Sequence, residues 1–362
     1  MKGRSKPRRL LARLLVAALL LGVIVTAAGS VLLWRQWRLL HAPYPEGPVS
    51  IVELEVEPGR SATSILDELE DRGAIESALR ARLFLTHVLD SPPLQAGEYR
   101  FELPTTTPAV LDKLIRGEVV ARPVTLLEGW TMEEMASHLA ISGFGDESRF
   151  LDLMSSAELV ADIAPQAQTL EGFLFPDTYA FTRNADERAI VEMLVATFRR
   201  RLERDVLPVT GPIEDLERVV TLASIVEREA SLDEERPLVA GVYANRLRRG
   251  MALFADPTVI YALQREGRWN GNLRRQDLEI DSPYNTYRYP GLPPGPICSP
   301  GVSSLLAAAA PVETDYLYFV SRNDGSHVFA ATLAEHNRNV EQWQRRYWRE
   351  RWARERRAGE SD

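Results

Sequence analysis

The 362-residue sequence contains a single cysteine, Cys298, and five scattered histidines. One cysteine cannot supply an intramolecular disulfide framework. The histidines form neither an HExxH pattern nor a Cys/His cluster, so nothing in the sequence indicates a zinc site. We therefore expect a protein that needs neither a metal ion nor a cofactor.

Outside the N-terminus, acidic residues outnumber basic ones. The first 35 residues contain seven Lys/Arg and no acid, although the whole chain has a formal net charge of −8. The rest of the chain is therefore acidic overall, which does not suggest nucleic-acid binding, and we expect no nucleic-acid partner. The chain is 45% hydrophobic and 26% charged, and its length suffices for about two globular domains.

Residues 14–34 form one long apolar stretch after the basic tail of residues 1–13. About 20 apolar residues suffice to cross a bilayer as a helix. The stretch exceeds a signal-peptide core and stays apolar beyond its small residues, which favours an uncleaved anchor over a signal peptide. Because basic residues precede the span, we expect the N-terminus in the cytoplasm. The sequence thus predicts a single-pass protein of the cytoplasmic (inner) membrane with an extracytoplasmic, periplasmic body.

Residues 35–50 contain three closely spaced prolines, typical of a short stiff linker. A strand, a glycine turn and a capped helix then occur twice, first from Leu54 and again from Val124. Two copies are too few for a solenoid. We interpret residues 51–123 as a small α+β subdomain that precedes a larger domain of residues 124–340.

The ends of these helices carry recognisable signals. Thr131 and Glu134 have the spacing of a capping box. Gly73 and Gly143 stand where helix C-caps usually fall. Both copies of the pattern are therefore expected to contain well-delimited helices.

The 51–123 subdomain resembles a LysM module. In such modules a strand and a helix pack on a second helix and strand, here 77–89 and 97–103. LysM modules bind glycans that contain N-acetylglucosamine, so the resemblance implies glycan binding. A purely spacing role is the alternative.

The most informative pattern of the larger domain lies between Leu216 and Ala230. Its apolar residues recur every three to four positions, as on the buried face of a helix. Glu227 falls on this face, whereas Glu229 points roughly the opposite way. A carboxyl group on an apolar face tends to keep its proton, so we expect its pKa above the ordinary value and take Glu227 as a candidate proton donor. The alternative is a structural glutamate held by an arginine or by backbone amides.

A proline- and glycine-rich region with interleaved tyrosines follows, and we interpret it as an ordered loop. A hairpin of 316–320 and 327–330 is expected to close the active-site cleft together with this loop. Sugars bind to surfaces where aromatic rings and amide or hydroxyl groups lie together. The candidate substrate-binding residues are Asp256, Thr258, Asn285, Thr286, Tyr287 and His327.

Several motifs in order resemble the YceG-like family of endolytic murein transglycosylases. They are Glu171-Gly172, Phe175-Pro176-Asp177-Thr178-Tyr179, Ala223-Ser224-Ile225-Val226-Glu227-Arg228-Glu229, Asn245-Arg246-Leu247, Asp256-Pro257-Thr258, Tyr284-Asn285-Thr286-Tyr287, Gly291-Leu292-Pro293-Pro294-Gly295 and Glu335-His336-Asn337. The resemblance implies an α+β fold: a single N-terminal transmembrane helix, a small LysM-like α+β subdomain and a mixed α+β catalytic domain. It also implies peptidoglycan glycan strands as substrate, peptidoglycan synthases as partners, and Glu227 as the catalytic glutamate.

The chain departs from the usual family pattern at a few positions. Phe254 and Ala255 stand where polar residues are frequent, Ala230 where threonine is frequent, and Ser299 where asparagine is common. These changes put individual hydrogen bonds to the substrate in question but leave Glu227 in place.

A single essential acid fits lytic cleavage. The glutamate donates a proton to the glycosidic oxygen and then accepts the proton of the C6 hydroxyl of N-acetylmuramic acid, leaving a 1,6-anhydro end. A hydrolase usually needs two carboxylates, and Asp256 or Asp177 is a candidate for the second. A two-carboxylate muramidase is therefore one alternative, and a membrane-tethered peptidoglycan-binding scaffold is another.

The C-terminal segment, residues 341–362, predicts a basic helix rich in aromatic residues, with Trp343, Tyr347, Trp348 and Trp352. Its aromatic edge is expected to pack on the catalytic domain. The alternative is an interfacial helix on anionic lipid or a docking site for a partner.

Overall fold

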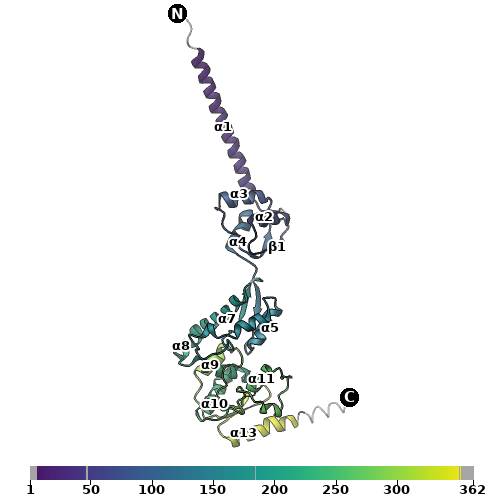
Figure 1. The fold of residues 1–362 in the computed structure, drawn as a ribbon, viewed down its shortest axis with the longest axis vertical. Helices are drawn as coiled ribbons and strands as arrows, with labels where there is room; N and C mark the ends of the chain where they lie inside the picture. The colour runs from purple at the N-terminus through teal and green to yellow at the C-terminus, as the bar shows by residue number, and fades with distance from the viewer. Residues whose placement is uncertain (1–5, 46–47, 184, 350, 352–362) are drawn as a thin grey trace, which may run out of the picture. The chain divides into compact units, whose positions relative to one another are not determined.

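The structure is a computed structural model that describes residues 6–45, 48–183, 185–349 and 351. The chain divides into two compact units, the first of residues 1–122 and the second of residues 123–362, apart from a few residues near Thr182. Each unit has its own hydrophobic core. Figure 1 shows the mixture of helices and short strands that confirms the predicted α+β fold class.

The first unit begins with α1 (Lys6–His41), a helix of 36 residues. Its segment Leu14–His41 is long and apolar enough to cross a membrane by length and composition, and its most apolar window is 0% buried against the rest of the protein. An apolar helical stretch that the described residues leave uncovered fits another apolar environment. The segment therefore fits a single-pass membrane anchor.

The rest of the first unit is a two-stranded sheet with three helices. The elements are β1 (Ser50–Val56), α2 (Ala62–Asp71), α3 (Ala78–His87), β2 (Gly97–Leu103) and α4 (Thr107–Arg116). The strands pair in antiparallel register with Leu54 opposite Tyr99. Leu54 and Val56 face the core while Glu53 and Glu55 are exposed, because successive side chains of a strand point to opposite faces.

The core of the first unit lies between this sheet and the helices. Its largest fully buried side chains are Tyr99, Leu54, Ile65, Leu66, Leu69, Ile75, Leu111 and Leu114. Ser61, Ser77 and Thr106 each cap a helix by accepting a backbone N–H with the side-chain oxygen. The order strand, helix, helix, strand is the one that the resemblance to a LysM module implies.

The second unit is mostly helical. Its strands are β3 (Arg122–Thr125), β4 (Thr178–Phe181), β5 (Tyr318–Ser321) and β6 (His327–Ala330), and they form the pairs β3–β4 and β5–β6. Its α-helices are α5 (Met132–Ile141), α6 (Glu147–Met154), α7 (Glu187–Arg201), α8 (Leu207–Thr210), α9 (Leu216–Glu229), α10 (Arg236–Arg248), α11 (Asp256–Arg265), α12 (Val302–Ala309) and α13 (Leu333–Val340). Short 3-10 or π-helical segments are η1 (Glu158–Val160), η2 (Leu202–Val206), η3 (Asp233–Glu235), η4 (Arg275–Glu279) and η5 (Glu341–Arg346).

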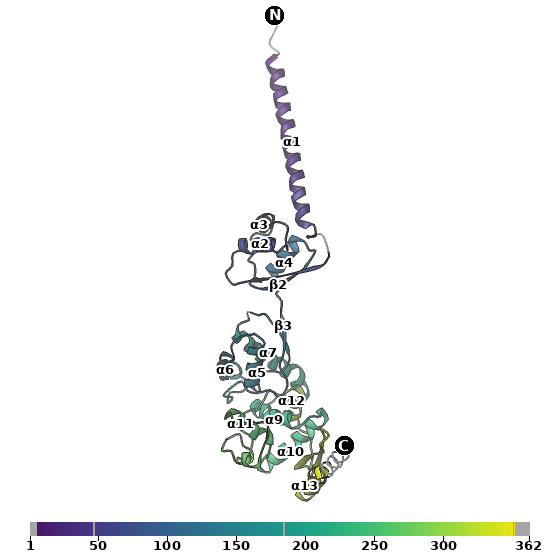
Figure 2. The same cartoon turned by 90° about the vertical axis from the view of Figure 1, so that its right-hand side faces the viewer.

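Helix α9 runs through the core of the second unit and packs against α10, α11 and α12 (Figure 2). Asp215 caps it by accepting the backbone N–H of Arg218 at 3.0 Å. Every residue from Val220 to Val226 is buried. The helix is therefore covered on all sides over these two turns, not along one stripe.

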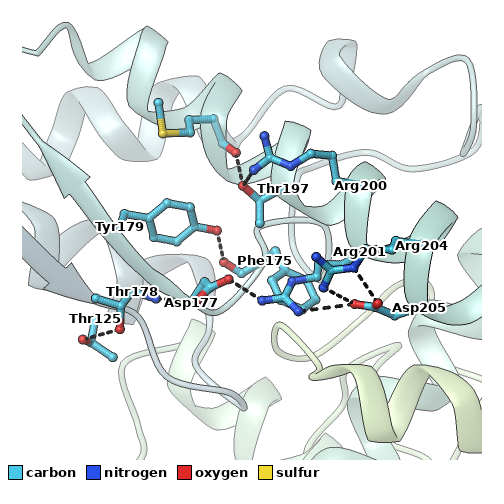
Figure 3. Close-up of polar contacts among 11 residues, drawn as sticks. Thr125, Phe175, Asp177, Thr178, Tyr179, Thr197, Arg200, Arg201, Arg204 and Asp205 are labelled. Carbon is cyan, nitrogen blue, oxygen red and sulfur yellow. Dashed lines mark hydrogen bonds and ion pairs between the residues drawn. The ribbon is translucent and has the colours of Figure 1, made fainter.

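The segment from Phe175 to Tyr179 is tied to the end of α7 by polar contacts (Figure 3). Arg201 pairs with Asp177 at 2.8 Å and with Asp205 at 3.3 Å. Its guanidinium also lies 5.4 Å from the centre of the Phe175 ring. The Tyr179 hydroxyl donates to the Phe175 carbonyl at 2.6 Å. These contacts fix the segment that leads into β4.

The predicted hairpin is present as β5 and β6, with Phe319 opposite Phe329. Helix α13 packs on both strands. The start of the C-terminal segment also contacts the hairpin, because Asn323 Nδ2 donates to the Trp343 carbonyl at 2.7 Å. Trp352 and the residues after it lie outside the described part of the chain.

Candidate active site

A pocket of about 460 Å³ opens in the second unit where α9 ends. It is lined by residues from α9, α10, α11, α13, the β5–β6 hairpin and the tyrosine-containing loop: Glu229, Tyr243, Arg246, Phe254, Asp256, Tyr287, Tyr318, Phe319, Val320, Ser321, His327, Leu333 and His336. Three candidate residues from the sequence, Asp256, Tyr287 and His327, are thus brought together from distant parts of the chain. The pocket mixes carboxyl groups with aromatic rings, which is the chemistry that a sugar site needs.

Glu229, the last residue of α9, presents its carboxyl group to this pocket. The Tyr243 hydroxyl donates to Glu229 Oε1 at 2.8 Å. The pKa of Glu229 is raised to about 7. Burial is the largest cause, the Tyr243 hydrogen bond opposes it, and the neighbouring charge of Asp256 adds to it. Its place at the carboxyl end of a helix also disfavours negative charge. Glu229 is therefore able to carry a proton near neutral pH.

Asp256 and Tyr287 form a second polar pair in the pocket. The Tyr287 hydroxyl donates to Asp256 Oδ1 at 2.5 Å. Asp256 is the first residue of α11, where the helix dipole favours a negative charge. Burial and the neighbouring carboxylate raise the pKa of Tyr287 above its ordinary value. Two carboxyl groups in different electrostatic settings, Glu229 and Asp256, thus face one cavity.

His327 is held by Glu235. The backbone N–H of His327 donates to Glu235 Oε1 at 2.8 Å, and its ring Nδ1 lies 2.7 Å from Glu235 Oε2. A carboxylate can only accept, so Nδ1 carries the hydrogen. The Nε2 atom is then the ring nitrogen left for other partners, and His327 lines the pocket.

The remaining wall combines aromatic rings with a buried arginine. The Arg246 guanidinium donates to the Leu317 carbonyl at 2.7 Å and lies 5.4 Å from the centre of the Tyr318 ring. Phe254 is 49% exposed and has a positive φ of 50°, an uncommon conformation for a bulky residue. Among the described residues, the buried Nδ1 of His336 has no hydrogen-bond partner. The wall therefore offers aromatic faces to a ligand.

Glu227 lies in a different setting. Its carboxylate pairs with Arg236 at 2.9 Å and accepts the backbone N–H of Gly301 at 2.9 Å. The two charged side chains are only 6% and 8% exposed. The charge of Glu227 contributes, after burial, to the raised pKa of the nearby Glu128.

These contacts match the alternative interpretation from the sequence, in which Glu227 is a structural glutamate held by an arginine or by backbone amides. Glu227 is not among the described residues that line the pocket. Helical phase alone could not show whether Glu227 or Glu229 faces the pocket, because α9 is buried on all sides over residues 220–226.

Three further candidates, Thr258, Asn285 and Thr286, are buried away from the described pocket lining and hold the loop together. Asn285 Nδ2 donates to the carbonyls of Leu278 and Ile280 at 2.9 and 2.8 Å. The hydroxyls of Thr258 and Thr286 are 2.9 Å apart. These residues fix the backbone that carries Tyr287.

Asp177, a candidate second carboxylate, is paired with Arg201 (Figure 3). After an opposing effect of burial, this pairing lowers the pKa of Asp177. Asp177 is also absent from the described lining of the pocket. Asp256 is thus the better placed of the two.

Sequence reasoning missed Glu229, Tyr243, Arg246 and His336 as members of the site. Arg246 and His336 belong to motifs that the sequence already carries, Asn245-Arg246-Leu247 and Glu335-His336-Asn337. Those motifs were the available signal for both residues. Tyr243 lies on α10 without a comparable signal.

Comparisons with known proteins show the family of the chain. The model of the YceG-like family matches residues 54–342. The endolytic murein transglycosylase of Bacillus subtilis (strain 168) is 30% identical over 334 residues, which cover 84% of this chain and 88% of that protein. The protein of the same name from Streptococcus pneumoniae serotype 2 is 27% identical over 319 residues, or 80% of this chain and 58% of that protein.

A solved structure is also similar. A crystal structure described as a YceG-like protein from Listeria monocytogenes superimposes with a TM-score of 0.53 at 32% sequence identity. The match covers 80% of this chain and 99% of that chain.

Proposed function

Since the chain belongs to the YceG-like family, we propose that it acts on peptidoglycan as an endolytic lytic transglycosylase. It cleaves the β-1,4 bond between N-acetylmuramic acid and N-acetylglucosamine within nascent glycan strands and leaves 1,6-anhydro-N-acetylmuramic ends. Such cleavage limits strand elongation. The observation that carries the proposal is a pocket in which a proton-bearing glutamate faces aromatic and polar groups, in a chain 30% identical to a protein named for this activity.

We assign the acid/base role to Glu229. Its pKa of about 7 lets the side chain hold a proton at neutral pH and release it during reaction. Glu227, the residue expected from the sequence, is instead engaged by Arg236 and the Gly301 amide. In this assignment Glu227 is a positioning residue that joins α9 to α10 and to the start of α12.

The reaction uses one carboxyl group twice. Glu229 donates its proton to the glycosidic oxygen as the bond from that oxygen to C1 breaks. The C6 hydroxyl then attacks C1 of the same sugar, and its proton passes to the Glu229 carboxylate. The C6–O–C1 bond closes the anhydro ring, and no water is consumed.

The other pocket residues bind the sugar and stabilise charge. The Asp256 carboxylate, held by Tyr287, stabilises the positive charge that develops near C1. His327 supplies its ring Nε2 for the sugar hydroxyls or acetamido groups. Thr258, Asn285 and Thr286 act indirectly, by fixing the loop.

A second candidate function is favoured by one observation. Asp256 is a carboxyl group in the same pocket as Glu229. A muramidase needs such a pair, one carboxyl group as acid and the other as nucleophile or base for water. The two reactions differ in their products: a hydrolase leaves reducing ends, whereas a lytic enzyme leaves anhydro ends.

The proposal includes a domain arrangement and a location. Residues 14–34 anchor the protein in the cytoplasmic membrane, with residues 1–13 in the cytoplasm and the units after the linker of residues 35–50 outside it. The LysM-like subdomain of residues 51–123 holds a glycan strand for the catalytic domain of residues 124–340, and peptidoglycan synthases act beside it. In the C-terminal segment of residues 341–362, Trp343 contacts the hairpin that lines the pocket.

The deciding experiment compares the full-length protein in detergent with its Glu229→Gln and Glu227→Gln variants. Each is incubated with peptidoglycan, and the new glycan ends are identified by mass spectrometry. We expect anhydro-muramic ends from the parent and a loss of roughly 10²–10⁴-fold in their rate of formation with Glu229→Gln. Thermal melting of both variants serves as the control for folding.

Other outcomes point to specific alternatives. Loss of activity in a folded Glu227→Gln protein, with Glu229→Gln still active, moves the acid/base role back to Glu227. Reducing ends indicate the hydrolase. Binding to peptidoglycan without any new ends indicates the membrane-tethered scaffold.

A further inference from the structure

A groove of about 740 Å³ lies in the first unit between the C-terminal part of α1 and the helix α3. Trp34 and Trp37 form one side of it, and Leu79, Leu83 and Phe84 the other. The Trp37 and Phe84 rings are 5.9 Å apart, which fixes α3 against the end of α1. We call this the juxtamembrane groove.

Helix α3 has two apolar faces although it is only ten residues long. Ala78, Ala81 and Leu85 are buried in the core of the first unit. Leu79 and Leu83, one turn apart, are 64% and 51% exposed. A core-facing helix normally carries polar residues on its outer face, so a second apolar face calls for a second apolar environment.

The position of the groove along α1 indicates what that environment is. The apolar stretch from Leu14 to Leu33 is about 30 Å long at about 1.5 Å per residue, the thickness of a bilayer's hydrocarbon core. Leu40 lies about 10 Å further along the axis. The residues of α1 that line the groove therefore begin at the edge of the acyl chains, at Leu33, and extend through the headgroup layer to Leu40.

The aromatic residues of α1 also indicate that the groove lies at the membrane–water interface. Trp34 and Trp37 are 61% and 51% exposed on α1, and tryptophan is enriched at the membrane–water interface. Because α3 packs beside Trp37, Leu79 and Leu83 lie at the same level as the tryptophans. Figure 1 shows α3 on the side of the first unit that α1 enters, with β1 further away.

We propose that lipid of the membrane's outer surface fills the juxtamembrane groove, with Leu79 and Leu83 inserted among the upper acyl chains. The first unit is then held to the membrane at two places, by α1 and by the outer face of α3. This fixes its orientation on the lipid surface. The inference rests on α1 spanning the membrane, as proposed above.

The test uses the full-length protein reconstituted at low density in phosphatidylcholine vesicles. Its native Cys298 is buried at 0% exposure, so a newly introduced cysteine is labelled selectively with an environment-sensitive fluorophore. Labels are placed singly at Leu83→Cys, at Gly22→Cys within the apolar stretch, and at Glu55→Cys on the exposed side of β1. Quenching by lipids with a nitroxide on the upper acyl chain is compared with quenching by aqueous iodide.

We expect the label at position 83 to be quenched by the nitroxide lipid at least several-fold more than the label at position 55. Its quenching by iodide should be correspondingly weaker. Equal behaviour at positions 83 and 55, with position 22 quenched by lipid, overturns the docking of α3 and leaves the anchor intact. If the label at position 83 is protected from both quenchers, a protein segment and not lipid fills the juxtamembrane groove, and the proposal is overturned. A label at position 22 that lipid does not quench overturns the anchor and, with it, this inference.

Discussion

Replacing Glu229 by glutamine should make the stability of the second unit less sensitive to pH. The ordinary pKa of a glutamate is 4.5, and that of Glu229 is about 7 in the folded protein. Below pH 4.5 the carboxyl group is protonated in both the folded and the unfolded chain. As the pH rises from 4.5 to 7, the unfolded chain releases the proton while the folded chain keeps it. The parent protein is therefore destabilised over this window, and the full cost is present above pH 7.

The size of the effect follows from the pKa change. A move from 4.5 to about 7 corresponds to about 3 kcal/mol, at about 1.4 kcal/mol per pKa unit. This is an upper value, because Glu229 is partly exposed to the pocket. For a unit of about 150–250 residues, 1 kcal/mol shifts the melting temperature by about 2–4 °C. The glutamine variant should thus gain at most about 6–12 °C over the parent between pH 5 and pH 8.

Calorimetry of the full-length protein in detergent at pH 5, 6, 7 and 8 measures this difference. The variant lacks an ionisable group at position 229 but keeps an acceptor for the Tyr243 hydroxyl. Glu118→Gln, at an exposed position of the first unit, is the matched control and should leave the second unit's transition unchanged. A melting difference between Glu229→Gln and the parent that stays constant or shrinks from pH 5 to pH 8 would refute the raised pKa. The acid/base assignment would then lose its support.

Three further substitutions test the surroundings of the site. Arg236→Met removes the ion-pair partner of the buried Glu227 carboxylate and should lower the free energy of unfolding by about 3–5 kcal/mol. Denaturant titrations should show that adding Glu227→Gln recovers much of that loss. A double variant no more stable than Arg236→Met alone contradicts the ion pair. Tyr287→Phe removes the hydrogen bond to the Asp256 carboxylate and should lower kcat roughly 10-fold, equivalent to about 1.4 kcal/mol in activation free energy. An unchanged rate of formation of glycan ends argues against a role of this hydrogen bond in the reaction. Gly172→Ala adds a methyl group 2.5 Å from Pro296 at a φ of +84° and should cost about 2–3 kcal/mol, whereas a melting temperature equal to the parent's would show that the backbone adapts.

Local features of the fold could be predicted because their causes are local in the chain. The capping box of Thr131 and Glu134 is present, and Gly73 and Gly143 adopt the positive φ angles expected after a helix. These features depend on a few neighbouring residues and their hydrogen bonds. The β5–β6 hairpin belongs to the same class, because its turn and strands are contiguous.

The candidate site could be predicted only in part. Asp256, Tyr287 and His327 line the pocket, while Thr258, Asn285 and Thr286 are buried behind it. A motif shows that a segment is special but not which of its side chains reach the cavity. The direction of each side chain depends on the loop's backbone, which is fixed by contacts such as that of Asn285 with two carbonyls.

The sequence by itself determined the long apolar N-terminal segment, the helix that carries both glutamates and the family resemblance, because these depend on composition, period and residue order. Only the tertiary structure decided which glutamate faces the pocket. Arg236 reaches Glu227 from α10 and Gly301 reaches it from the start of α12, whereas Tyr243 and the hairpin surround Glu229. On a helix buried on all sides, the environment of a carboxyl group is set by the elements packed against it. The helical period does not show which element packs against which face of the helix.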